Sequence, residues 1–113
     1  LKELISKAKL YTPNVYLLAE IAPLNRGFGK GPGGINWPPD LANKQAQNIV
    51  EQLENAINIS KSENVTLINA YKESLMIGKF GNPVYVSSHD GIHPSVEGHV
   101  LMANLIAKTI ILK

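Results

Sequence analysis

Two short, almost wholly apolar runs flank one long helical pattern, and this arrangement most narrows the folds open to the chain. The runs are VYLLAEIA, at 15–22, and VTLINA, at 65–70. Strands that are apolar throughout are typical of a parallel sheet that helices cover on both faces. We therefore predict an α/β layered fold with a parallel sheet.

The segment between the two runs predicts an amphipathic helix. Asp40 follows two prolines, and we expect it to cap the start of this helix. Behind it, apolar residues recur at helical spacing, namely at Ala42, Ala46, Ile49, Val50, Leu53, Ala56 and Ile57.

Weaker signals predict the remaining elements. The first ten residues have the apolar spacing of a helix, 71–77 is a candidate short helix, and PVYV, at 83–86, is a candidate third strand. Ser95 is a candidate N-cap for a last helix that reaches almost to Lys113. Three strands, one of them very short, are few for a sheet covered on both faces. The chain also begins at Leu1 rather than Met, so we expect it to be part of a larger domain.

Composition removes several classes of function. Apolar residues make up 44% of the 113 residues, so the chain can bury a core. It has no cysteine, which excludes disulfides, cysteine-ligated metals and a thiol nucleophile. Its eleven Lys and Arg are scattered among nine Asp and Glu, so we expect no nucleic-acid partner. No run approaches the roughly 18 apolar residues of a membrane span, and we expect none.

The stretch HDGIHPSVEGH, at 89–99, holds the residues with the clearest chemistry. A histidine that acts as a general base needs its other ring nitrogen held, usually by a carboxylate that stabilises the imidazolium. Asp90 and His93 lie three residues apart, and Gly91 between them permits a tight bend. Pro94 keeps His93 out of the α region, so the last helix starts after it. We therefore predict an Asp90–His93 pair at the carboxyl end of the third strand.

Other interpretations of this stretch stay open. Asp90 is also a typical turn acid, and His93 could be a partly buried histidine without a chemical role. A metal site is a further possibility because imidazole and carboxylate groups are common ligands. Its candidate ligands are His89, Asp90, His93, Glu97 and His99. No pair of them has the His-Glu-x-x-His spacing of a zinc-binding helix.

The block DGIHPSVEGHVLMANLIA resembles the C-terminal block of the SGNH, or GDSL-type, serine esterase and acylhydrolase family. That block has an Asp-x-x-His-Pro turn, a Gly-His pair and an apolar terminal helix, which match Asp90, His93, Pro94, Gly98 and His99. The resemblance implies a flavodoxin-like, three-layer α/β/α sandwich, of which residues 1–113 are the C-terminal portion. It implies that His93 is the general base and Asp90 its orienting partner, without a metal or organic cofactor.

The resemblance also implies a serine nucleophile that this chain does not contain. In the family the serine lies in a Gly-Asp-Ser block near the N-terminus, and further glycine and asparagine blocks complete the oxyanion hole. None of the serines here follows Gly-Asp; they are Ser6, Ser60, Ser62, Ser74, Ser87, Ser88 and Ser95. We expect the nucleophile on a missing N-terminal segment or a companion chain, and this chain alone to be a poor esterase or none.

A glycine- and proline-rich segment at 23–39 carries the remaining functional signal. It holds five of the nine glycines and four of the seven prolines, so we predict a long loop. Long loops inside compact domains are often functional. Phe28 and Trp37 could line a pocket for an acyl or sugar group, although Trp37 could equally pin the loop to the following helix.

The leading hypothesis is a serine ester hydrolase that acts on a small-molecule, carbohydrate or lipid ester and takes Asp90 and His93 from this chain. One alternative is a non-catalytic α/β binding module with the 23–39 loop as its contact surface. The other is a histidine-rich metal-binding domain.

Overall fold

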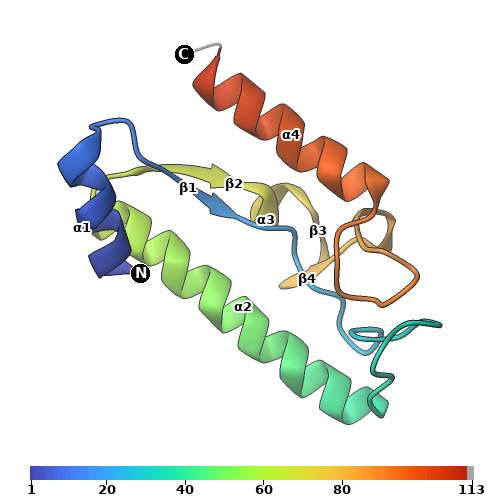
Figure 1. Cartoon of the computed structure of the whole chain (residues 1–113). Helices are drawn as coiled ribbons and strands as arrows, with labels where there is room; N and C mark the ends of the chain where they lie inside the picture. Colours follow the sequence, from blue (N-terminus) through green and yellow to red (C-terminus); the bar gives the residue numbers. More distant parts are fainter. Residues whose placement is uncertain (112–113) are drawn as a thin grey trace.

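The computed structural model describes residues 1–111 of the chain and contains both helices and strands (Figure 1). In chain order the elements are α1 (Lys2–Tyr11), β1 (Tyr16–Ala19), α2 (Pro39–Ser62), β2 (Thr66–Asn69), α3 (Ala70–Glu73), β3 (Leu75–Ile77), β4 (Phe80–Gly81), the 3-10 helix η1 (Pro83–Tyr85) and α4 (Val96–Ile110).

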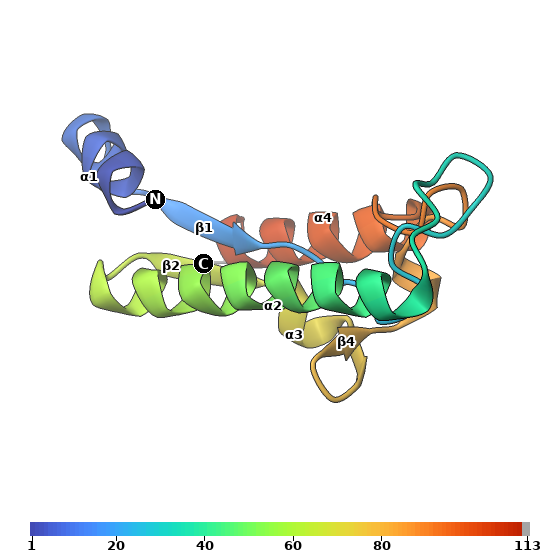
Figure 2. The same cartoon turned by 90° about the horizontal axis from the view of Figure 1, so that it is seen from below.

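The two apolar runs form the parallel strand pair that the sequence predicts. Tyr16 of β1 lies opposite Thr66 of β2, and Ala19 lies opposite Asn69. Both α2 and α4 contact these strands, and they lie on opposite sides of the pair (Figures 1 and 2). The strands are four residues each, shorter than the predicted runs, because the chain leaves the sheet after Ala19 and after Asn69. The α/β class with a parallel sheet is confirmed.

Apolar side chains are buried on both sides of the strand pair. One cluster, towards α2, consists of Ala19, Ala22, Val50 and Tyr71. A second, towards α4, consists of Ile21, Ala70, Val86 and Met102. Successive side chains of a strand point to opposite faces, so a strand that serves two cores must be apolar throughout. This explains why β1 shows no polar alternation.

The segment after β2 differs from the prediction. Only Ala70–Glu73 is helical, and Leu75–Ile77 instead pairs with Phe80–Gly81 around Gly78. Ser74, the C-cap residue, has a buried hydroxyl that donates to the Ala70 carbonyl at 2.7 Å and accepts from the Ala22 N–H at 2.7 Å. The end of this helix is therefore tied to a residue 52 positions away along the chain.

The predicted third strand at 83–86 is wrong. Pro83–Tyr85 forms a 3-10 turn, and Val86 makes a single antiparallel bridge to Pro94. The Asn82 side chain accepts from the Val84 N–H at 3.0 Å, and a proline in the first position has the backbone angle of a helical turn. The turn that follows is therefore not at the carboxyl end of a strand.

The structure corrects the predicted N-cap of one long helix and confirms that of the other. Pro38, not Asp40, is the N-cap of α2, since Pro39 already fits the first helical position and brings the start forward. Asp40 lies in the first turn and pairs with Arg26 at 3.2 Å. Ser95 caps α4 as predicted, accepting from the Gly98 N–H at 3.1 Å. Leu112 and Lys113, to which that helix was expected to extend, lie outside the described residues.

Among residues 1–111, no helix is both long enough and apolar enough to cross a membrane.

Candidate active site

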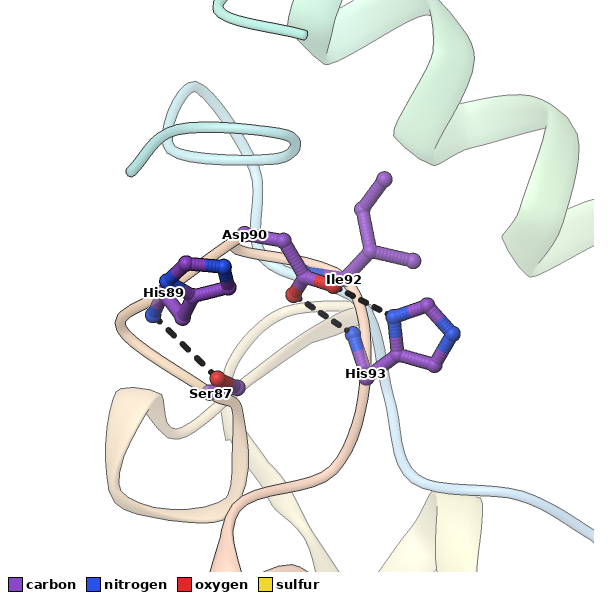
Figure 3. Close-up of polar contacts among 5 residues, drawn as sticks. All are labelled: Ser87, His89, Asp90, Ile92 and His93. Carbon is purple, nitrogen blue, oxygen red and sulfur yellow. Dashed lines mark hydrogen bonds and ion pairs between the residues drawn. The ribbon is translucent and has the colours of Figure 1, made fainter. Parts of the chain in front are cut away.

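The stretch before α4 folds into a turn that hydrogen bonds among residues 87–93 close. The Ser87 N–H donates to the His93 carbonyl at 2.7 Å, and the Gly91 N–H donates to the Ser87 carbonyl at 2.8 Å. Gly91 has a φ of 68°, which glycine adopts without strain. The bend turns the Asp90 carboxylate towards the backbone and the ring of His93 (Figure 3).

Three groups of the turn hold the Asp90 carboxylate. Its Oδ1 accepts from the backbone N–H groups of Ile92, at 2.9 Å, and of His93, at 3.0 Å. Its Oδ2 contacts Nδ1 of the His93 ring (Figure 3). The Asp90 side chain is 17% exposed, whereas the His93 side chain is 78% exposed. The carboxylate is therefore enclosed while the imidazole stays accessible.

These hydrogen bonds lower the pKa of the Asp90 carboxyl group. The backbone N–H of Ile92, followed by the ring and the backbone N–H of His93, lowers the pKa of Asp90 to about 2. The carboxylate is therefore ionised at neutral pH. An ionised carboxylate on Nδ1 favours the tautomer with its proton there, which leaves Nε2 as the basic nitrogen.

A cavity of about 460 Å³ opens beside His93, between the end of β1, α2 and the turn. Most of its lining is apolar, and the lining residues are Glu20, Ile21, Pro23, Phe28, Ile49, Gln52, Leu53, Ile92, His93 and Pro94. A partly apolar cavity with a few convergent polar groups is the usual form of a small-molecule site.

The structure separates the two aromatic residues of the 23–39 loop. Phe28 lines the cavity with His93, whereas Trp37 does not. Trp37 stacks on Phe28 with ring centroids 5.7 Å apart, and it packs on the cluster that Phe28 forms with Ala42 and Ala46 of α2. Trp37 therefore packs the loop onto α2, which was the alternative interpretation of this residue. It contacts the cavity only through Phe28.

Glu20 and Gln52 also line the cavity, and our sequence reasoning missed both. A signal existed for Glu20, which is the single charge in the apolar run 15–22 and directly follows β1. The carboxyl ends of parallel strands are where α/β folds place ligand-binding groups. Gln52 is one of many polar residues on α2, and its position facing the cavity has no signal in the sequence.

The hydroxyl groups of Ser87 and Ser95 bond to backbone groups and not to the His93 ring. The Ser87 hydroxyl accepts from the His89 N–H at 3.2 Å, and the Ser95 hydroxyl donates to the Val84 carbonyl at 2.6 Å. Over residues 1–111, no hydrogen bond joins a serine hydroxyl to the His93 ring.

The histidines do not gather around a common point. In the part of the chain that the structure describes, no three His, Asp or Glu side chains are placed to hold a metal ion. The alternative site at His89, Asp90, His93, Glu97 and His99 therefore has no geometric support.

Two solved structures have a similar fold. A GDSL-like lipase from Bacteroides thetaiotaomicron VPI-5482 matches with a TM-score of 0.64 and 20% sequence identity, over 97% of this chain and 48% of its own. A proposed acylhydrolase from Bacteroides fragilis NCTC 9343 matches with a TM-score of 0.62 and 20% identity, over the same shares of both chains. The chain therefore spans about half the length of these relatives.

The sequence itself matches a family model. The model of the GDSL-like lipase/acylhydrolase family matches residues 1–106, which is nearly the whole chain. None of the curated proteins compared with the chain matches it. The family match covers both the strand pair and the turn at 87–93, and the chain belongs to the GDSL-like lipase/acylhydrolase family.

Proposed function

We propose that this chain supplies the Asp90–His93 pair of a serine ester hydrolase. The observation that carries the proposal is the geometry of the pair: an enclosed, ionised carboxylate on Nδ1 of a histidine that is open to a cavity. This is the arrangement in which a carboxylate holds a general base in one tautomer and orientation. Membership of a hydrolase family supports it.

In the proposed reaction His93 transfers protons and Asp90 keeps its charge throughout. Nε2 of His93 takes the proton of a serine hydroxyl as the serine oxygen attacks the ester carbonyl. The resulting imidazolium is stabilised by Asp90 and gives its proton to the leaving alcohol as the C–O bond breaks. Water then attacks the acyl-enzyme with His93 again as base, which releases the carboxylic acid and restores the serine.

The serine and the oxyanion hole belong to a part of the protein outside these residues. We propose that residues 1–113 are the C-terminal portion of one domain, and that the serine comes from an N-terminal segment or a companion chain. Over residues 1–111 the parallel sheet has only two strands. The relatives of twice the length support this reading. Further strands from the missing part would complete a three-layer α/β/α sandwich.

The cavity indicates the class of ester. Ile21, Phe28 and Leu53 give it an apolar wall beside His93, and an apolar wall favours the acyl chain of a carboxylic ester over a charged group. Glu20 and Gln52 offer hydrogen-bonding groups for the polar end of a substrate. We propose a neutral ester with a short apolar acyl chain, free or carried on a carbohydrate or lipid.

The direct test replaces His93 by alanine in the complete protein and measures hydrolysis of short-chain p-nitrophenyl esters. Loss of the general base should lower kcat on the order of 10⁶-fold. His99→Ala is the matched control, because His99 is an exposed histidine at the start of α4 and should leave kcat unchanged. If His93→Ala kept its hydrolysis, the assignment of His93 as the general base would be wrong. A complete protein that hydrolysed no ester even with His93 in place would favour the non-catalytic binding module instead.

A further inference from the structure

The glycine-rich part of the loop after β1 lies against the turn that carries Asp90. Figures 1 and 2 both draw the two segments side by side at one end of the molecule. The Gly33 N–H donates to the His89 carbonyl at 2.8 Å, and the Gly29 N–H donates to the Gly91 carbonyl at 3.2 Å. The loop thus holds the two residues on either side of Asp90 by their backbones.

The contact is so close that neither partner has room for a side chain. A Cβ on Gly31 would lie 2.2 Å from the His89 carbonyl oxygen, and Gly31 has a φ of 148°. A Cβ on Gly91 would lie 2.6 Å from the Lys30 nitrogen. Real Cβ atoms do not approach backbone atoms at such distances, so any side chain here must displace the loop or the turn.

Asn36 braces the loop from its other side. Its Oδ1 accepts from the Gly31 N–H at 3.1 Å. Its Nδ2 donates to the carbonyls of Gly31 and Gly34, both at 3.0 Å. Asn36 has a φ of 60°, a conformation that asparagine tolerates better than most residues do. One exposed side chain therefore fixes the shape of the loop that meets the turn.

We propose that Gly31 and Asn36 are positioning residues for the Asp90–His93 pair. By keeping the loop packed on the turn, they allow the Gly33 and Gly29 N–H groups to hold the backbone at His89 and Gly91. That backbone sets the position of the Asp90 carboxylate, and through it the orientation of the His93 ring. Their importance for catalysis rests on the proposed function. Their effect on the ring does not, because it is a property of the folded chain.

The test measures the His93 ring by ¹⁵N NMR, at a pH where the imidazole is neutral. Contact with Asp90 should make the Nδ1–H tautomer predominate. Asn36→Gly removes the three bracing hydrogen bonds without backbone strain, and it should shift the population towards the Nε2–H tautomer. Asn64→Gly is the matched control: Asn64 is the other non-glycine residue with positive φ among residues 1–111, and it lies at the far end of α2. It should leave the ring unchanged.

A second pair of variants acts on the contact itself. Gly31→Ala forces the loop from the turn, whereas Gly78→Ala adds the same methyl group at another positive φ where nothing lies within 4 Å. In the complete protein Gly31→Ala should lower kcat on the order of 10²-fold, as ångström-scale misplacement does, and leave KM within about twofold. Gly78→Ala should change neither.

The outcomes separate this proposal from the proposed function. A tautomer shift in Asn36→Gly and Gly31→Ala supports the positioning role, even if the complete protein hydrolyses no ester and the proposed function fails. An unchanged ring signal in Asn36→Gly overturns the positioning role, even if His93→Ala abolishes hydrolysis. Far-UV circular dichroism of each variant verifies that the ring signal comes from folded protein.

Discussion

The turn at 87–93 and the strand pair differ in how far along the chain their partners lie. Asp90 receives its hydrogen bonds from groups two and three residues away. Tyr16–Ala19 pairs with Thr66–Asn69, about fifty residues later. The contact between Asp90 and His93 is thus made within its own turn, whereas the strand pair depends on a distant partner. Changes in the turn should lower catalysis more than stability, and changes in the scaffold should do the reverse.

Of the variants that test this comparison, Asp90→Asn in the complete protein should have the largest effect. The amide can still accept from the backbone N–H groups of Ile92 and His93, but it cannot stabilise an imidazolium or enforce the tautomer. Ester hydrolysis should fall on the order of 10⁴-fold in kcat. Asp40→Asn is the control. Asp40 forms an exposed ion pair with Arg26, and this variant should leave ester hydrolysis unchanged. Equal activity of the two variants would remove Asp90 from the mechanism.

Met102→Ala probes the scaffold. Met102 is buried between α4 and the strand pair, and its truncation should lower the free energy of unfolding by about 2–5 kcal/mol. Val100→Ala on the same helix, where Val100 is 51% exposed, should cost much less. Urea denaturation measures both. A shift of the His93 tautomer in folded Met102→Ala would show that turn and scaffold are coupled.

Ser95 lies where the turn and the scaffold meet, so its effect should be intermediate. Ser95→Ala removes the cap on the Gly98 N–H and the hydrogen bond to the Val84 carbonyl. The expected loss is about 1 kcal/mol of unfolding free energy. Ser95→Thr retains the hydroxyl and should recover most of it in the same urea experiment. A loss in Ser95→Thr as large as in Ser95→Ala would mean that the hydroxyl is not what stabilises α4.

Acid titration should show the smallest effect. The pKa of Asp90 is about 2 in the folded chain, below the roughly 3.9 of an unfolded aspartate. Its stabilising contribution is therefore fully present above about pH 4 and is lost as the pH falls towards 2. Urea unfolding between pH 5 and 2 should show a shallower loss of stability in Asp90→Asn than in the unchanged chain. Parallel curves would show that the carboxylate gains nothing from its turn on folding.

Sequence patterns predicted the elements whose signals are local. The apolar runs, the helix behind Asp40 and the Ser95 cap are each decided by residues within a few positions, and the structure confirms them. The pattern failed at 71–77 and 83–86. There the chain makes a buried hydrogen bond to the Ser74 hydroxyl and a bridge from Val86 to Pro94. Neither contact produces a periodic pattern in the sequence.

By itself the sequence determined that Asp90 and His93 meet, because three residues and a glycine bend suffice to bring them together. Only the tertiary structure decided what surrounds them: Phe28 in the cavity wall, Trp37 behind it, and the loop at 29–36 against the turn. Those partners lie more than fifty residues from Asp90. Spacing along the chain carries information about neighbours within a turn or a helix, whereas contacts across the fold arise only when the packed elements fix the loops between them.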